Sequence, residues 1–305
     1  MFSQMAALRT LVVAGLVVGA AACGGGQSEE QPGGTAASAV VIRLTGSDTM
    51  VNLDQAWAEN YRSVAPDVSV QIAGGGSGVG IAGLIDGILD IAASSRKMEP
   101  EEIERATKSA GAAPKEFVVG LDALAVYVHE SNPLQSISIE ELAEVYGEGG
   151  QTTKWSQLGA KSPLCAADDI IRVSRQNNSG TYAYFREAVL GRTRELRLGS
   201  VDQSGSKDVV SLVSRTPCAI GYSGMAYADK GVRALPISKK KGEPGVPPAL
   251  ETALNGTYPI SRPLYFYSRG TPSPQAQAFI DWSLSDAGQK ILQDIGYVPA
   301  PKSAP

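Results

Sequence analysis

The sequence predicts an α/β fold in which mostly parallel β-sheets are flanked by helices. From residue 40 onward, short apolar runs alternate with segments of helical periodicity, and strands that alternate with helices form βα units. Glycine is plentiful, with 34 residues, whereas aromatic residues make up only 6% of the chain. This composition favours glycine-rich connections over a heavily aromatic core. The length of 305 residues and the hydrophobic content of 43% suffice for a large core and suggest about two domains.

The first predicted elements follow from the spacing of apolar residues. Residues 41–44 are an apolar strand, and apolar side chains then recur at helical spacing from Met50 to Val64, which predicts an amphipathic helix over 49–64. A helix is predicted over 100–110, because acidic residues in its first turn interact favourably with the helix dipole. The other elements predicted before residue 115 are a strand at 68–72, a glycine-rich turn at 74–80, a helix at 81–89 and a strand at 90–93.

The apolar segment 117–128 is too long for one ordinary strand, so we expect a strand that leaves one sheet at residues 121–123 and enters another. Ser138 and Glu141 form a capping-box pair that opens a helix over 138–146. Ser273 is the expected N-cap of a last helix that runs from about residue 274 to 295. The remaining predictions are strands at 170–174, 219–222 and 263–267, helices at 181–190 and 207–214, and a basic, proline-rich loop at 239–248.

The N-terminal segment predicts export. Residues 1–22 contain an apolar stretch of the length of a signal peptide, too short to span a membrane comfortably. Small residues precede Cys23, as in the lipobox of bacterial lipoproteins, although Ala20 replaces the usual leucine. We therefore expect lipidation of Cys23 and a flexible tether over 23–39. The alternative is an ordinary signal peptide that is cleaved after one of the alanines.

Two further cysteines, Cys165 and Cys218, would then lie in an oxidising compartment, where an even pair suggests a disulfide. The alternative is a pair of buried thiols. The single histidine, His129, argues against histidine-based catalysis and against most transition-metal sites. A net charge of −4 gives no broad basic surface for nucleic acid, and no Walker, dinucleotide, HExxH or CxxC motif is present.

Three segments share a design in which a strand is followed by glycine and hydroxyl residues and then by a helix. They are residues 45–49, 74–78 and 179–181. Free N–H groups at a helix N-terminus attract an anion, and glycine lets the backbone approach it. Singly, each segment has the composition of an ordinary helix cap; together they favour one converging anion site.

Two arginines follow predicted strands near these segments. Arg175 precedes Ser179 by four residues, and its planar guanidinium suits two oxygens of an oxyanion. Arg96 follows Ser94 and Ser95 at another strand end, and the alternative for it is an ion pair with a local carboxylate. The alternative for Arg175 is a solvated surface position.

Taken together, several stretches resemble the phosphate-binding proteins of ABC-type phosphate importers, within the type II periplasmic binding protein superfamily. The resemblance runs from about residue 40 to residue 299, and its most telling stretches are residues 46–50, 74–78, 90–96, 175–181, 219–222 and 288–299. It implies two α/β lobes with a ligand cleft between them. Lobe 1 would comprise residues 40–122 and 232–305, and lobe 2 residues 123–231.

The resemblance also implies the ligand and the residues that hold it. The ligand would be inorganic phosphate, bound by Ser47 or Thr49, Ser77, Ser95, Arg175, Ser179, Gly180 and Thr181. Asp48 and Arg96 complete the expected phosphate-binding set. Some members of the family carry a ligand-binding aspartate where Ser95 stands here, and Asp48 is the candidate to accept the proton of the phosphate instead. The alternative for Asp48 is an ordinary helix-capping carboxylate.

The predicted function is capture of phosphate by a lipid-anchored protein in the periplasm or at the cell surface, followed by delivery to the permease of an ABC-type importer. We expect a monomer with no cofactor, no metal and no enzymatic activity. The nearest rival is a protein of the same fold for sulfate, molybdate or tungstate. Two more distant candidates are a receptor that feeds a sensor and a secreted phosphatase, which would need a metal cluster or a nucleophile with a base.

Overall fold

The computed structural model describes residues 40–301. The predicted signal peptide (1–22), tether (23–39) and lipidation site (Cys23) lie outside the described residues. Within residues 40–301, none of the helices is long and apolar enough to cross a membrane.

The strands lie at most of the positions predicted from the sequence, and several short strands were not predicted. In chain order they are β1 (Val40–Gly46), β2 (Val68–Ala73), β3 (Ile91–Ser94), β4 (Lys115–His129), β5 (Ile137–Ser138), β6 (Ile171–Arg175), β7 (Val201–Gln203), β8 (Ala219–Gly224), β9 (Val232–Leu235), β10 (Ile237–Ser238), β11 (Ser261–Ser268) and β12 (Val298–Pro299).

The helices alternate with these strands. They are α1 (Val51–Tyr61), α2 (Ser77–Ile85), α3 (Pro100–Ala110), α4 (Ile139–Tyr146), α5 (Gly180–Leu190), α6 (Ser206–Val213), α7 (Leu250–Leu254), α8 (Pro274–Ser283) and α9 (Asp286–Ile295), with the short 3₁₀ helices η1 (Trp155–Leu158) and η2 (Met225–Tyr227).

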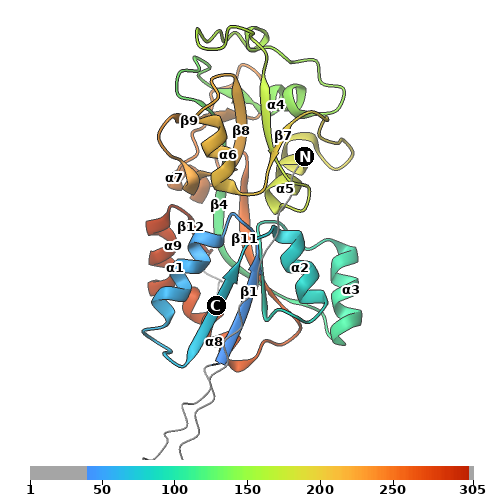
Figure 1. Cartoon of the computed structure of the whole chain (residues 1–305), viewed down its shortest axis with the longest axis vertical. Helices are drawn as coiled ribbons and strands as arrows, with labels where there is room; N and C mark the ends of the chain where they lie inside the picture. The colour runs from blue at the N-terminus through green and yellow to red at the C-terminus, as the bar shows by residue number, and fades with distance from the viewer. Residues whose placement is uncertain (1–39, 302–305) are drawn as a thin grey trace, which may run out of the picture. The chain divides into compact units, whose positions relative to one another are not determined.

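The main sheet has the strand order β2-β1-β3-β11-β4-β8-β6-β7. The pairs toward both ends of this order are parallel, as predicted from the βα alternation. Every pair that involves β4 or β11 is antiparallel, because β11 runs opposite to β3 and β4, and β4 runs opposite to β8, β9 and β12. In Figure 1 they lie between a half that contains α1, α2 and α3 and a half that contains α4, α5 and α6. The α/β fold class is confirmed.

Strand β4 joins the two halves of the sheet. Residues 115–123 pair with β11, and residues 124–128 pair with β8. The expected transition of this long strand near residues 121–123 is therefore present in the structure. Each half has its own packing, with Trp57 against Phe266 at a centroid distance of 5.7 Å in one and Phe185 stacked on Tyr222 at 3.7 Å in the other.

The pairing of β9 changes where we place the boundary between the expected lobes. Residues 232–235 pair with residues 126–129 of β4, and β10 pairs with β5, so this stretch adds to the half that contains β8. The chain returns to the other half with β11, which pairs with β3. The division into lobes remains a proposal, which we now draw as residues 40–122 with 261–301 and residues 123–260, instead of a return at residue 232.

Serine N-caps begin four of the helices that the structure describes, α4, α5, α8 and α9. Ser138 and Glu141 form the predicted capping box at the start of α4, and Ser273 caps α8 by accepting from Ala276 N. The single helix expected over 274–295 is wrong, because α8 ends at Ser283 and Ser285 begins α9 by accepting a hydrogen bond from Gly288 N. A serine N-cap therefore divides the expected helix in two.

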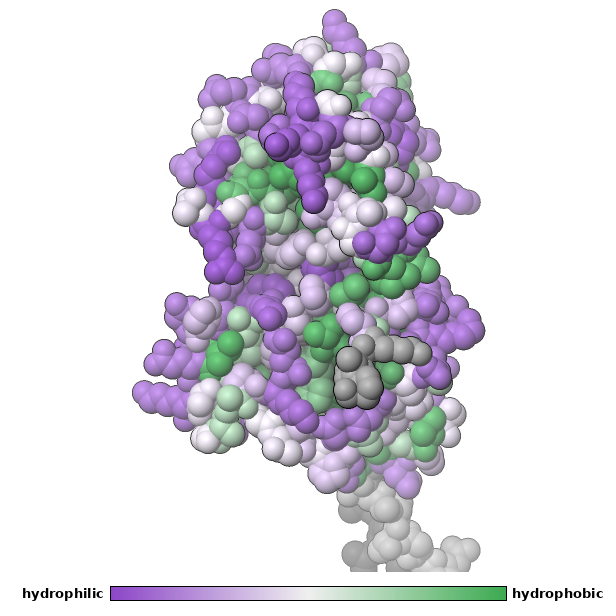
Figure 2. All heavy atoms as spheres, turned by 180° about the vertical axis from the view of Figure 1, so that it is seen from behind, coloured by the Kyte–Doolittle hydropathy of each residue, from purple (hydrophilic) through white to green (hydrophobic). Residues whose placement is uncertain are grey.

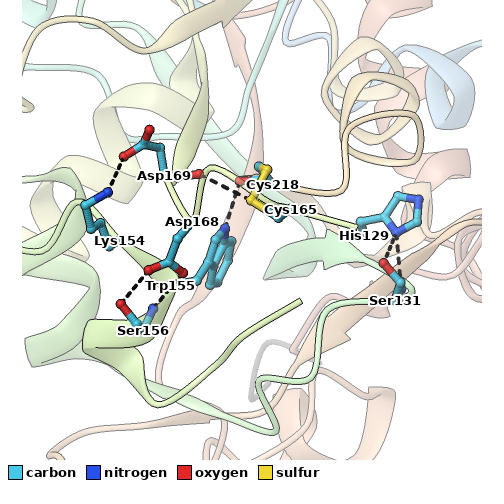
Figure 3. The surroundings of a disulfide bond; sticks show 9 residues. All are labelled: His129, Ser131, Lys154, Trp155, Ser156, Cys165, Asp168, Asp169 and Cys218. Carbon is cyan, nitrogen blue, oxygen red and sulfur yellow. Dashed lines mark hydrogen bonds and ion pairs between the residues drawn. A yellow bond between two sulfur atoms is a disulfide. The ribbon is translucent and has the colours of Figure 1, made fainter. Parts of the chain in front are cut away.

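Cys165 and Cys218 form a disulfide whose Cα atoms are 5.2 Å apart (Figure 3). It connects the loop before β6 to the residue before β8, two strands that are neighbours in the sheet. The indole Nε1 of the buried Trp155 donates to the Cys218 carbonyl at 3.0 Å.

His129, the single histidine, accepts a hydrogen bond through Nδ1 from Ser131 N at 3.1 Å, and both residues appear in Figure 3. On the face in Figure 2, apolar areas are small and separated by hydrophilic residues.

Asp54 in α1 is a carboxylic acid that the fold buries without compensation. It is 1% exposed, and among the described residues its Oδ1 has no hydrogen-bond partner. Desolvation by burial raises the pKa of Asp54 well above its usual range. Because the pKa of Asp54 is higher in the folded than in the unfolded state, ionisable Asp54 lowers the free energy of unfolding at pH values above its pKa in the unfolded chain. This cost disappears as the pH falls below the unfolded-state pKa.

We therefore expect Asp54→Asn to raise the free energy of unfolding at pH 8 by about 1–3 kcal/mol. The gain should shrink toward pH 3, below the ordinary pKa of an aspartate, where the wild-type side chain is mostly protonated in the unfolded as well as the folded state. Urea unfolding of both chains at the two pH values measures the difference. The matched control is Asp67→Asn, at an exposed position, and an equal gain in that variant would contradict the explanation.

Candidate functional site

Four helix N-termini meet at one place in the middle of the sheet. Helices α1, α2, α5 and α6 each follow the end of a strand, namely β1, β2, β6 and β7. The hydroxyl residues in these connections are buried, from 0% to 3% exposed; they are Ser47, Thr49, Ser77, Ser179, Thr181 and Ser206. The free backbone N–H groups and the dipoles of the four helices make a region of positive potential without adding any net charge.

One group of hydroxyls comes from β1, α2 and the end of β3. Ser47 Oγ donates to Ser95 Oγ at 2.8 Å, and Ser95 Oγ lies 3.4 Å from Ser77 Oγ. Ser95 N also donates to Ser77 Oγ at 3.1 Å. Ser95, after β3, thus connects the loops at 45–49 and 74–78, which also meet directly where Gly76 N donates to Gly46 O at 3.0 Å.

A second group joins the two halves of the sheet. Thr49 Oγ1, before α1, lies 2.9 Å from Thr181 Oγ1 in the first turn of α5. It also lies 3.5 Å from Ser206 Oγ at the start of α6. The three segments singled out in the sequence therefore converge in space, whereas their role as anion ligands stays a prediction. Ser179 takes a local role as well, because its Oγ accepts from Thr181 N at 3.1 Å and caps α5.

Arg175, at the end of β6, is completely buried beside these hydroxyls. Its Nη2 donates to Asp48 Oδ2 at 2.8 Å and its Nη1 to Ser206 Oγ at 3.0 Å. Burial lowers the pKa of Arg175, and the charge of Asp48 opposes that shift. The alternative of a solvated arginine is therefore wrong for this side chain. A buried guanidinium with a single carboxylate partner is well suited to bind an anion.

Asp48 contacts both halves of the site. Its Oδ1 accepts from Gly75 N at 2.9 Å, while its Oδ2 binds Arg175. Each carboxylate oxygen thus already accepts one hydrogen bond, so the structure gives Asp48 a positioning role for Arg175. The expectation that it accepts a proton of the ligand stays a prediction.

Arg96 does not join the cluster. Its guanidinium binds both carboxylate oxygens of Glu102 at 2.7 Å, and Nη1 also donates to Lys97 O. Glu102 is the third helical residue of the α3 capping box, which explains why its carboxylate is available at this point. The local ion pair considered from the sequence is the arrangement in the structure, so we remove Arg96 from the proposed ligands.

Glycine allows the two halves to approach closely. A Cβ at Gly180 would lie 2.3 Å from Ser77 Oγ, and one at Gly76 would lie 2.8 Å from Asn178 O. Asn178 also bonds across this contact, since its Nδ2 donates to Gly75 O at 2.9 Å and its carbonyl accepts from Gly78 N at 3.0 Å. The glycines of the 74–78 loop therefore allow close contact with the other half, whereas their approach to a ligand stays a prediction.

Ser206 and Arg262 were not predicted as site residues. A signal for Ser206 exists, because Ser204, Gly205 and Ser206 repeat the glycine and hydroxyl design after β7 and before α6. Arg262 lies within β11, 1% exposed, and its guanidinium reaches Thr49 and Thr181. No local pattern distinguishes it from any other arginine in a strand.

Comparison with known proteins decides the family. A model described as "PBP superfamily domain" matches residues 29–287. The chain belongs to this superfamily. Its relatives include the phosphate-binding protein PstS of Pseudomonas aeruginosa, 35% identical over 266 residues, which cover 84% of this chain and 82% of the relative. The corresponding protein of Bacillus subtilis is 30% identical over 260 residues, which cover 85% of this chain and 80% of the relative.

Solved structures agree with this assignment. A candidate phosphate ABC transporter substrate-binding protein from Clostridium perfringens, with bound phosphate, superposes with a TM-score of 0.75 and 29% identity over 86% of this chain and 100% of that chain. An ABC-type phosphate transport receptor from Vibrio cholerae gives a TM-score of 0.67 and 25% identity over 85% of this chain and 100% of that chain. The resemblance that the sequence motifs indicated is confirmed.

Proposed function

We propose that this chain captures inorganic phosphate outside the cytoplasm and delivers it to an ABC-type importer. The observation that carries the proposal is the buried group of hydroxyls and helix N-termini beside Arg175. Hydroxyl and amide donors can surround the four oxygens of a tetrahedral anion, and the guanidinium supplies a paired donor for two of them. The relatives that carry the name phosphate-binding protein support the same ligand.

The proposed cycle consists of capture, closure and delivery. In it the anion first binds one lobe, and the second lobe then completes its hydrogen-bond shell, which favours the closed form by differential affinity. The contacts of Asn178 with Gly75 and Gly78 would hold the closed form together. The importer permease would recognise that form, and no covalent bond would change.

We propose that the chain is not an enzyme. Among residues 40–301 we find no group of histidine, cysteine or acidic side chains arranged to hold a metal. The one histidine contacts Ser131 at the end of β4 and none of the clustered hydroxyls. Lipidation of Cys23 and a monomeric state belong to the same proposal, and they rest on the sequence and the family resemblance alone.

A related protein for another oxyanion remains the second candidate. The observation that favours it is that both Asp48 oxygens already accept a hydrogen bond, from Gly75 N and Arg175 Nη2, which leaves fewer lone pairs for a phosphate proton. Sulfate at neutral pH has no proton to donate, so it would not need such an acceptor.

Titration calorimetry distinguishes these candidates. The chain is unfolded and refolded to remove carried ligand and is then titrated with phosphate, sulfate and molybdate. We expect phosphate to bind with a dissociation constant of about 1 μM or lower, which corresponds to roughly −8 kcal/mol. Tighter binding of sulfate or molybdate would instead assign the chain to that anion, and no binding of any of them would reject the proposed function.

A further inference from the structure

Arg262 places a second buried guanidinium at the centre of the molecule. It lies in β11, which pairs with both β3 and β4. Asp122 on β4 is its ion-pair partner: Oδ2 accepts from Nη2 at 2.8 Å and from Nε at 3.1 Å. Both side chains are at most 1% exposed, and burial of an arginine at this depth requires such a partner.

The other side of this guanidinium faces the clustered hydroxyls. Nη2 lies 3.2 Å from Thr49 Oγ1 and 3.0 Å from Thr181 Oγ1, and Nη1 lies 3.3 Å from Ser95 O. Nη2 carries two hydrogens but is within reach of three acceptors, these two hydroxyls and Asp122. Nη2 therefore donates into the hydroxyl cluster, where an anion oxygen that came between Thr49 and Thr181 would be the strongest acceptor.

The two guanidiniums are connected through the same hydroxyls. Thr49 Oγ1 lies next to Arg262 Nη2 and 3.5 Å from Ser206 Oγ, which in turn accepts from Arg175 Nη1 at 3.0 Å. Each guanidinium also has one carboxylate, Asp48 for Arg175 and Asp122 for Arg262. The positive and negative charges of these four side chains cancel, which explains how two arginines can be buried together.

We propose that Arg262 is a second anion-binding guanidinium of the site, held in place by Asp122 as a positioning residue. The inference rests on the proposed function and assigns to the anion one donor that belongs to none of the glycine and hydroxyl segments. Strands β4 and β11 fix this donor at the point where the two halves of the sheet join. It therefore contacts Ser95 and Thr49 from one half and Thr181 from the other.

The test is titration with inorganic phosphate of the wild-type chain and three variants. Arg262→Lys keeps a cation for Asp122 but loses the planar pair of donors, and we expect it to weaken binding by about 10-fold. The double variant Arg262→Met/Asp122→Asn leaves no lone buried charge, and we expect it to weaken binding by about 100-fold or more. The matched control is Arg269→Met, whose exposed arginine lies just beyond β11 and donates to Ser109; its affinity should stay within about 2-fold.

A second measurement keeps the test independent of folding. In ¹⁵N spectra of the wild-type chain, the Arg262 side-chain resonance should shift on addition of phosphate and not on addition of equal sodium chloride. Thermal unfolding of each variant without phosphate separates lost affinity from lost structure. If the wild-type chain binds phosphate while both Arg262 variants bind within about 2-fold of it, or while the resonance stays still, the inference is overturned and the proposed function stands. If the wild-type chain does not bind phosphate, the proposed function itself is rejected.

Discussion

Arg175→Met should reduce the affinity for phosphate by about 100-fold or more, since truncating one partner of a buried, hydrogen-bonded charge pair costs several kcal/mol. The variant loses the donor to Ser206 and leaves Asp48 beside the anion site without its cation. The remaining carboxylate would then repel the anion. Titration calorimetry with phosphate measures the loss, and circular dichroism checks that the fold is retained.

Arg96→Met is the matched control for this substitution. Both arginines lie next to a serine at a strand end, Arg175 as the last residue of β6 and Arg96 two residues after β3, but Arg96 binds Glu102 at the start of α3. Its loss should lower the stability of the chain by about 1–3 kcal/mol and leave the phosphate affinity within about 2-fold. Equal loss of affinity in the two variants would contradict the arrangement of the site described above.

Gly180→Ala should weaken phosphate binding by about 10- to 100-fold, because overpacking at a close contact typically costs 1–3 kcal/mol. The added Cβ would lie 2.3 Å from Ser77 Oγ and 2.7 Å from Ser95 Oγ. Those hydroxyls come from the other half of the sheet, so the methyl group would push apart the two surfaces that, in the proposed cycle, close around the anion. Calorimetric titration of the variant gives the change directly.

Gly191→Ala, at the opposite end of α5, separates this steric effect from the general cost of replacing a glycine. Gly191 has φ +74°, and its Cβ would meet nothing within 4 Å. Alanine in this conformation should lower stability by about 1 kcal/mol and leave phosphate affinity unchanged. If Gly191→Ala weakened phosphate binding as much as Gly180→Ala, the close contact with Ser77 would not be the cause.

The local part of the site was predictable from the sequence. A strand end followed by glycine and hydroxyl residues and a helix is a pattern of adjacent residues, so the loops around Ser47, Ser77 and Ser179 could be identified one by one. The same pattern around Ser206 was overlooked. The fold class was equally accessible, because the alternation of strands and helices is also a local signal.

The remaining features depend on contacts between distant residues. Arg96 and Arg175 occupy similar local sequences, and only the position of Glu102 on one side and of Asp48 on the other determines which of them is available. Arg262 becomes part of the cluster because β11 lies between β3 and β4, and this strand order cannot be inferred from any single stretch of the sequence. The pairing of β9 with β4 likewise brings together residues about a hundred positions apart.

The neutral balance of the buried side chains has a kinetic consequence. The chain as a whole carries a formal charge of −4, so at a distance a phosphate ion meets weak repulsion rather than guidance. Attraction from amide dipoles acts only over the last few ångströms of the approach. Dissolved salt shortens the range of the repulsion without reaching the enclosed donors. Uptake by this protein would therefore be slowed little by a saline medium, unlike uptake by a carrier that recruits its cargo with a positively charged exterior.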